Sequence, residues 1–248
     1  MKYLFCSLCL GKSYTDSCMD FSKKLYSFNK SVKHLLVSDQ DKKTFNSKNI
    51  IFKKFNDELQ VRNPNIPEHL NFNYNLKYYP IKEAINQDVD FIFFIDADWQ
   101  IDNSKNGFSI EKIEALLQWF NKSEYDFLFE RPHLIGASVS KEGIGNCFFQ
   151  HKIKPFKLSE TCKYKNSHVC NEQFLLFKNN SKLKKFVKAW EDRYHFCVKN
   201  NVWQFAEGVE IGMSATDAKM KSTYDWPYNA IRNCFIFETK QGLFYNRW

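Results

Sequence analysis

Two aspartates separated by one small residue, Asp96 and Asp98, are the residues best suited to chemistry in this chain. They lie in the stretch DVDFIFFIDADWQI, directly after an apolar run that ends at Ile95. Such a run is typical of a buried strand. Two carboxylates at positions i and i+2 of a strand end can both approach one hard divalent cation. The pattern predicts a Mg²⁺ or Mn²⁺ site completed by phosphate oxygens of a substrate. The alternative is a pair of solvated acids.

A second pair of acids, Glu207 and Glu210, lies in the stretch FAEGVEIG. If this segment is helical, their spacing places both side chains on one face. The surrounding residues are too apolar for a surface acidic patch. Paired carboxylates can orient an acceptor hydroxyl or stabilise an oxocarbenium-like state, so we predict that both are catalytic. The alternative is a structural acid paired with a lysine or arginine at a helix start.

The first expected strand, in KYLFCSLCLGKSY, is followed by residues suited to a nucleotide. Gly11 lets the backbone approach a ligand closely, and Lys12 provides a positive charge for a diphosphate. Asp39 could accept hydrogen bonds from a base or ribose, and Lys77 or Lys82 could reach a phosphate. Each of them could equally be an ordinary surface or turn residue. The residues predicted to bind the nucleotide are Leu10, Gly11, Lys12, Tyr14, Asp39 and Lys77.

Five residues of the second half are predicted to contact the sugar or the acceptor: Glu130, Arg131, His168, Glu172 and Trp203. Glu130 and Arg131 follow an apolar segment as a charged pair, for which a surface salt bridge is the alternative. His168 is also a candidate third metal ligand, although a lone histidine is more often structural. Glu172 precedes an apolar segment and is either a core ion pair or a site acid. Trp203 is a candidate for stacking on a sugar.

The elements that must position these residues alternate between strands and helices. Continuous apolar runs predict strands, apolar residues at helical spacing predict helices, and Asp16 is expected to cap the first helix. The expected strands cover residues 2–11, 32–40, 50–55, 88–95, 125–132 and 172–178, and the expected helices cover residues 16–28, 76–86, 109–121 and 181–199. This alternation predicts an α/β fold with a mixed, mostly parallel central sheet flanked by helices. Ligands of such sheets bind beyond the carboxyl ends of the strands.

The composition limits the classes of protein. With 44% hydrophobic residues among 248, the chain can form a large core, which excludes a disordered protein. The net charge of +8 favours anionic partners such as a nucleotide, a polyanion or a membrane surface. Cys6 and Cys9 form a CxxC without a second such pair, so we expect buried, reduced thiols rather than a zinc site.

No apolar run approaches the roughly 20 residues of a membrane span. We therefore expect a soluble, cytoplasmic protein. The chain shows no repeat and no linker, which predicts one domain over residues 1–248. Within it we expect a nucleotide-binding half over about residues 1–100 and an acceptor half over about residues 101–248.

Four segments resemble, in order and spacing, the GT-A nucleotide-sugar glycosyltransferases, and most closely the histo-blood-group type, glycosyltransferase family 6. DVDFIFFIDAD is similar to the family's metal-binding segment, and CLGKSY to its first-strand segment, which ends in Gly-Lys-Tyr. VKHLLVSDQ resembles a second strand that ends in Thr-Asp, and FLFERPHLIGASVSKEGIG resembles the segment near the sugar and acceptor. The family's Trp-His-Asp-Glu-Ser motif is absent, and the resemblance assigns Glu207 to the catalytic glutamate.

The resemblance implies a single GT-A (Rossmann-like) domain that binds a nucleotide-diphosphate sugar, with Mn²⁺ or Mg²⁺ between Asp96, Asp98 and the diphosphate. It implies transfer of the sugar to a glycan or another hydroxyl acceptor with retention of anomeric configuration. Glu207 would act as nucleophile or electrostatic stabiliser. Animal members carry a membrane-anchor segment that this chain does not show, which implies a soluble bacterial or phage-like member.

Two alternatives stay open at this point. The first is a glycosyltransferase that acts on modified DNA bases, which the positive charge favours although no nucleic-acid-binding motif is present. The second is a non-catalytic nucleotide- or carbohydrate-binding protein. Loss of turnover on replacement of Asp96, with the fold intact, would count against the second.

Overall fold

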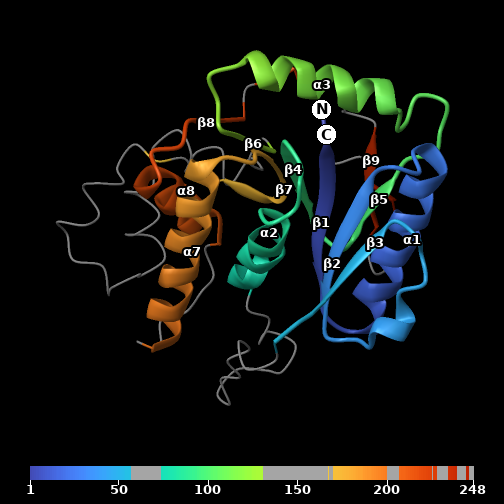
Figure 1. Ribbon diagram of the computed structural model, residues 1–248, viewed down its shortest axis with the longest axis horizontal. Helices are drawn as coiled ribbons and strands as arrows, with labels where there is room; N and C mark the ends of the chain where they lie inside the picture. Colours follow the sequence, from blue (N-terminus) through green and yellow to red (C-terminus); the bar gives the residue numbers. More distant parts are fainter. Residues whose placement is uncertain are drawn as a thin grey trace.

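A seven-stranded sheet forms the centre of the molecule, which we describe from a computed structural model (Figure 1). The structure describes residues 1–56, 74–130, 167, 170–199, 207–224, 226–227, 234–238 and 244–245. The strands of this sheet are β1 (Tyr3–Cys9), β2 (Lys33–Ser38), β3 (Ile50–Lys54), β4 (Phe91–Ile95), β6 (Phe127–Glu130), β7 (Asn171–Lys178) and β8 (Ser222–Thr223). Their order across the sheet is β3-β2-β1-β4-β7-β6-β8.

The sheet is parallel from β3 to β4 and mixed from β4 to β8. Strands β3, β2, β1 and β4 run parallel to one another, whereas β7 is antiparallel to both β4 and β6. Strand β8 is parallel to β6. The predicted α/β fold with a mixed, mostly parallel sheet is therefore confirmed. Strands from both predicted halves, residues 1–100 and residues 101–248, join this one sheet.

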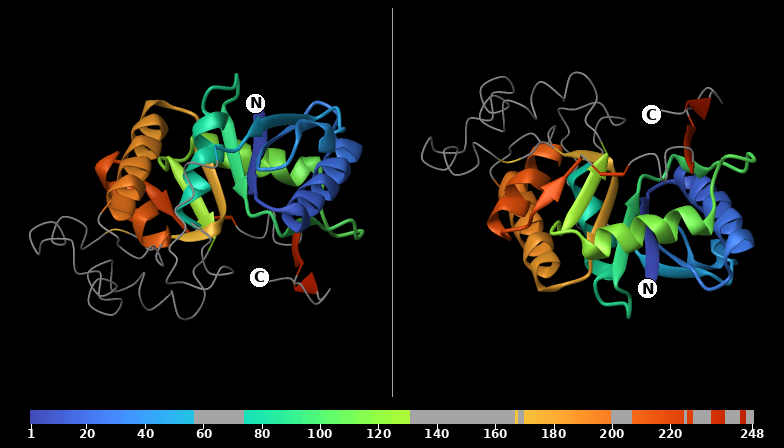
Figure 2. Two further views of the ribbon diagram at one scale, coloured as in Figure 1. Left: turned by 90° about the horizontal axis from the view of Figure 1, so that it is seen from below. Right: turned by 90° about the horizontal axis from the view of Figure 1, so that it is seen from above.

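Helices cover both faces of the sheet, as the two views of Figure 2 show. They are α1 (Lys12–Phe28), α2 (Tyr78–Ala84), α3 (Ile110–Lys122), α7 (Ser181–Lys199) and α8 (Glu207–Asp217), with the short 3-10 turns η1 (Lys42–Thr44) and η4 (Tyr74–Lys77). Successive side chains of a strand point to opposite faces. Leu4 and Cys6 of β1 therefore pack in the core formed with α2, α7 and α8, and Phe5 packs in the core formed with α1 and α3.

Helix α1 begins earlier than the sequence predicts. Gly11 is its N-cap residue and has no side chain to cap it, while Asp16 lies inside the helix and forms a 2.6 Å ion pair with Lys12. The prediction that Asp16 caps the helix is therefore wrong. The chain turns directly from strand to helix at Gly11, whose φ of 82° suits glycine, so α1 starts before Asp16 is reached.

A second, three-stranded sheet was not predicted from the sequence. It consists of β5 (Trp99–Ile101), β9 (Phe235–Glu238) and β10 (Phe244–Tyr245) in the order β10-β9-β5. The ring of Phe235 contacts the rings of Phe5, Trp99 and Phe174 at centroid distances of 6.0–6.3 Å. A segment near the end of the chain thereby braces the strand that follows Asp98.

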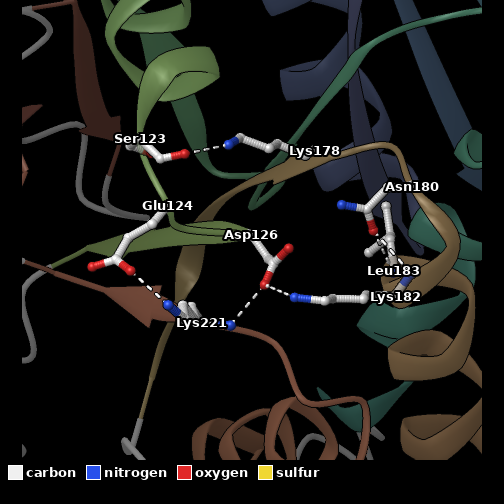
Figure 3. A network of polar contacts seen from close by, with 8 residues as sticks. All are labelled: Ser123, Glu124, Asp126, Lys178, Asn180, Lys182, Leu183 and Lys221. Atoms are coloured by element: carbon white, nitrogen blue, oxygen red, sulfur yellow. Dashed lines mark hydrogen bonds and ion pairs between the residues drawn. The ribbon is translucent and has the colours of Figure 1, made fainter.

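A polar network stabilises the end of the large sheet that lies opposite to β3, where β6, β7, β8 and α7 meet (Figure 3). The buried carboxylate of Asp126 accepts a 2.8 Å hydrogen bond from the backbone of Lys221 and lies 2.8 Å from Lys182 Nζ. The Asn180 side chain accepts from the backbone N–H groups of Lys182 and Leu183, and so caps α7. The bonds to Asp126 connect the start of α7 to the residues directly before β6 and β8.

Two further expectations concern thiols and membrane spans. Cys6 and Cys9 are buried and free, as predicted. Among the helices of the described residues, none combines the length and the apolar character needed to cross a membrane.

Candidate active site

The two aspartates of the predicted metal site lie directly after β4, whose five residues are all buried. The backbone N–H of Asp96 donates to the carbonyl of Gln173 in β7 (3.0 Å), and the N–H of Trp99 donates to the carbonyl of Asp96 (3.1 Å). The second bond closes a tight turn between β4 and β5, and the first connects this turn to β7. The side chains of Asp96 and Asp98 are partly exposed on this turn.

The residue between the aspartates, Ala97, anchors the turn. Ala97 is buried and packs with Cys9 and Cys18, which come from the end of β1 and from α1. A hydrogen bond with Cys9, together with burial, raises the pKa of the Cys18 thiol well above its ordinary value. The Cys18 thiol therefore stays protonated near pH 7 and supports the turn as a neutral packing residue.

Lys77 neutralises one of the two aspartates. Its Nζ lies 2.9 Å from Oδ1 and 3.0 Å from Oδ2 of Asp96, and the two side chains are only 10% and 17% exposed. Leu76 and Tyr78 on either side of Lys77 are fully buried, so the backbone at this point is held in the core. Solvent screens a partly buried pair weakly, which makes this contact strong.

The structure distinguishes the two lysines that the sequence proposed as phosphate ligands. Lys82 lies in α2, which starts directly after Lys77, and its Nζ forms a 2.7 Å ion pair with Glu191 of α7. Lys82 therefore holds two helices together, whereas Lys77 reaches the acidic turn. That Lys77 binds a phosphate stays a prediction.

Gly11 and Asp39 lie where β1 and β2 end. The backbone N–H of Gly11 donates to both carboxylate oxygens of Asp39, at 2.9 and 3.1 Å, and Gln40 Nε2 donates to one of them at 3.0 Å. A carboxylate accepts about four hydrogen bonds, so Asp39 can still accept one from a ligand. A Cβ built on Gly11 would meet no atom within 4 Å, which leaves open space beside this turn.

The other predicted nucleotide residues lie around this turn. Leu10 packs in the core, so it could contact a ligand only through its backbone. Lys12 is largely exposed and paired with Asp16. Tyr14 is partly buried and packs against the cluster around Ala97. The assignment of these three residues to a nucleotide stays a prediction.

These residues come together because their strands share one edge of the sheet. Cys9 pairs with Ser38 and Cys6 pairs with Phe94, so β1, β2 and β4 end at the same side. Strand β7 runs the opposite way and starts there, since Phe174 pairs with Ile95. The structure thus brings Gly11, Asp39, Lys77, Asp96 and Asp98 to one edge.

Helix α8 begins near the same edge. Its second residue, Gly208, accepts a hydrogen bond from the N–H of Cys170 (3.1 Å), just before β7 starts. The segment is helical, as predicted, so Glu207 and Glu210 lie one turn apart along α8. Glu210 is buried, and burial of the Tyr194 phenol in α7, together with the nearby Glu210 carboxylate, raises the pKa of that phenol.

Six of the predicted site residues lie, wholly or by their side chains, outside the described part of the chain. Arg131, His168 and Trp203 lie outside the described residues. Glu130, Glu172 and Glu207 belong to β6, β7 and α8, but their side chains lie outside what the structure describes. Their roles at the sugar or the acceptor stay predictions.

A buried histidine network beneath the site was missed from the sequence. His34 of β2 lies between two serine hydroxyls, with Nε2 3.0 Å from Ser7 Oγ and Nδ1 2.8 Å from Ser22 Oγ. Ser7 also donates to the carbonyl of Ile95, directly before Asp96 (2.7 Å). Burial lowers the pKa of His34 to about 3, so the ring is neutral near pH 7. Its only sequence signal is a single histidine in an apolar strand.

The donor set fits a hard divalent cation. Asp96 and Asp98 provide carboxylate oxygens, which Mg²⁺ and Mn²⁺ prefer, and a cationic ammonium group already lies at Asp96. Within the part of the chain that the structure describes, no group of three or more His, Cys, Asp or Glu side chains could hold a metal. The remaining ligands would have to come from a substrate or from residues outside that part.

Comparisons with known proteins assign no family to the chain. No protein-family model matches it, and no curated protein matches it. Two of the similar solved structures are of LgtC, a galactosyltransferase. One, in complex with donor and acceptor sugar analogs, is 12% identical, with 90% of this chain and 73% of that chain covered and a TM-score of 0.47. The other, an active-site mutant, is 11% identical over 90% and 72% of the two chains, with a TM-score of 0.43.

A likeness at this identity and TM-score assigns neither a fold family nor an activity to this chain. Both structures are of a galactosyltransferase, and neither is of the histo-blood-group type. The closer resemblance to that type therefore gains no support from these comparisons and stays a prediction.

Proposed function

We propose that this chain is a metal-dependent glycosyltransferase that moves a sugar from a nucleotide-diphosphate donor to an acceptor hydroxyl. One observation carries the proposal: Asp96 and Asp98 follow β4 at the sheet edge where β1 ends near Gly11 and β2 ends near Asp39. Ligands of α/β sheets bind at the carboxyl ends of parallel strands. A diphosphate placed there lies between the acidic turn and the open space beside Gly11.

The roles of the residues follow from their positions. Asp96 and Asp98 would hold Mn²⁺ or Mg²⁺, which neutralises the charge that develops on a diphosphate leaving group. Gly11 lets the phosphates approach the start of α1, where backbone N–H groups favour anions. Asp39 keeps this turn in place through its bonds to the Gly11 N–H and accepts one more bond from the nucleotide.

The sugar and the acceptor would bind on the side of β7 and α8. Glu207, at the start of α8, would act at the reacting sugar with retention of configuration, as the resemblance to the histo-blood-group type implies. Glu210 is the neighbouring candidate. The residues proposed to contact sugar or acceptor are Glu130, Arg131, His168, Glu172 and Trp203. The chain would act as one domain over residues 1–248 in the cytoplasm.

The test is a panel of nucleotide sugars assayed for hydrolysis with and without Mn²⁺, because transferases slowly hydrolyse their own donors. We expect one donor class to be turned over only with the metal, and Asp98→Asn to remove this activity. Asp88→Asn is the matched control, since Asp88 is an exposed acid that precedes the same strand. Metal-independent turnover, or none with any donor, would contradict the proposal.

A second candidate function is glycosyl transfer to modified DNA bases, and the distribution of charge favours it. Residues 1–56 contain eleven lysines, four aspartates and no glutamate, so they account for most of the net charge of +8. Phosphate backbones bind such surfaces in a salt-dependent way. Transfer to hydroxymethylated duplex DNA, with an affinity that falls steeply with salt, would favour this candidate over a glycan acceptor.

A further inference from the structure

The contact between Lys77 and Asp96 bears on how the proposed metal site is filled. The ammonium group lies within 3.0 Å of both carboxylate oxygens, so it occupies positions where a cation bound by Asp96 would lie. A divalent cation bound by Asp96 would therefore lie a few ångströms from a second cation. Like charges at this distance repel strongly in a partly buried site.

Lys77 cannot leave the site by a movement of its backbone. Leu76 before it and Tyr78 after it are fully buried, and Tyr78 starts α2, which packs in the core with α7 and α8. Only the four-carbon side chain can reorient, so the ammonium group stays within a few ångströms of the acidic turn. It needs an anionic partner in its new position, because a partly buried ammonium without one is costly.

We propose that Lys77 competes with the divalent cation for Asp96 and moves to a phosphate oxygen of the donor when that donor binds. This inference rests on the proposed function. The ammonium group of Lys77 offsets the carboxylate charge of Asp96, which weakens the attraction of the turn for a dication. A diphosphate adds negative charge and gives Lys77 a second partner. Metal and donor then bind cooperatively, and the protein alone binds the metal poorly.

The experiment measures binding of Mn²⁺ alone, from the loss of its free EPR signal, and in separate runs with UDP or GDP after subtraction of the Mn²⁺ that the nucleotide binds without protein. We expect Lys77→Met to bind Mn²⁺ alone at least about tenfold more tightly than the wild type, because a competing charge is removed. Lys77→Arg, which keeps the charge, should bind Mn²⁺ as weakly as the wild type. Lys82→Met is the matched control, since Lys82 pairs with Glu191, and it should leave Mn²⁺ binding unchanged.

The wild type provides a second measurement that does not depend on the fold of a variant. Mn²⁺ should raise the affinity for the diphosphate, and the diphosphate should raise the affinity for Mn²⁺ by the same factor, at least about tenfold. Equal Mn²⁺ binding with and without nucleotide would overturn the inference. So would folded Lys77→Met that binds Mn²⁺ alone no better than the wild type.

These outcomes are separable from failure of the proposed function. If the wild type binds Mn²⁺ with a diphosphate but Lys77→Met shows no gain, only the role of Lys77 is wrong. If no form of the protein binds Mn²⁺ under any condition, the metal site itself is wrong, and with it the inference. Adding Asp98→Asn to Lys77→Met should remove the gain, which shows that it arises at this turn.

Discussion

A Cβ atom built on Gly208 would lie 2.1 Å from the carbonyl oxygen of Cys170. The two backbones are therefore closer than any other residue type would allow, and a hydrogen bond from the Cys170 N–H to the Gly208 carbonyl holds them there. Because Cys170 immediately precedes β7, this contact sets the position of the first turn of α8, including Glu207, relative to the sheet.

Gly208→Ala should therefore destabilise the protein, although alanine in place of glycine within a helix usually stabilises by about 0.5–1 kcal/mol. The added methyl group would push the start of α8 away from β7. We expect a lower midpoint in urea unfolding and lower turnover per folded molecule. Gly11→Ala is a useful comparison, because its cost comes from the positive φ and not from lack of space. A stabilised Gly208→Ala variant would show that the contact relaxes without cost.

Asp98→Asn removes one negative charge from the acidic turn. We expect metal-dependent affinity for a nucleoside diphosphate to fall at least about tenfold, since one strong ligand is lost. Stability without metal should change little, because Lys77 already neutralises Asp96. Isothermal titration with and without Mn²⁺, together with thermal unfolding, checks both points. A variant that binds the diphosphate and Mn²⁺ like the wild type would remove Asp98 from the site.

Glu207→Gln keeps the size of the side chain and removes its charge. If Glu207 acts where positive charge develops on the reacting sugar, kcat should fall about 100-fold or more with little change in donor Kd. A structural acid would instead lose stability, by about 1–3 kcal/mol if its pair is buried. Turnover per folded molecule, measured beside the melting temperature, separates the two. Normal turnover would make Glu210 the next candidate.

His34 gives the stability a defined dependence on pH. Burial lowers the pKa of its folded form to about 3, whereas the unfolded chain binds the proton near pH 6.5. Unfolding therefore takes up a proton as pH falls below about 6.5, and stability is lost down to about pH 3. Between pH 7 and pH 5 this loss is about 2 kcal/mol. In His34→Gln, urea unfolding should show a shallower loss over this interval, and an unchanged slope would contradict the assignment.

Asp126 and Glu124 form a matched pair of acids on the same segment (Figure 3). Asp126 is buried and accepts from the backbone of Lys221, whereas Glu124 is 65% exposed and pairs only with the Lys221 side chain among the contacts drawn. Asp126→Ala should lower the free energy of unfolding by about 1–3 kcal/mol, because it leaves a buried N–H without its acceptor. Glu124→Ala should cost far less, because solvent screens an exposed ion pair. If chemical denaturation gave the same loss of unfolding free energy for both variants, burial of the carboxylate would not determine that loss.

The central strands were predictable because their signals are local. The apolar runs before Gly11 and Asp96 are long enough to define buried strands, and the parallel order of these strands places their ends together. The small sheet was not predictable, since β5 has three residues and pairs with a strand far along the chain. Asp16 was wrongly expected to cap α1 because a glycine N-cap gives no side-chain signal.

The partners of the acidic turn could not be predicted for a similar reason. Lys77 and Lys82 are equivalent in the sequence, and only the packing of η4 and α2 directs one to Asp96 and the other to Glu191. Asp39 was expected to face a ligand, whereas it also holds the N–H of Gly11. Pairings between residues this far apart depend on the whole sheet.

The hydrogen bond from Asp96 to Gln173 has a consequence for synthesis of the protein. The ribosome adds Gln173 roughly 80 residues after Asp96, which at about 5–20 residues per second takes on the order of 4–16 s. During that interval β4 can pair with β1, but its other edge has no partner strand. An apolar strand with an open edge pairs readily with other chains. The nascent protein is thus most prone to aggregate after β4 has emerged and before β7 covers it, and a chaperone that binds apolar strands would act in this window.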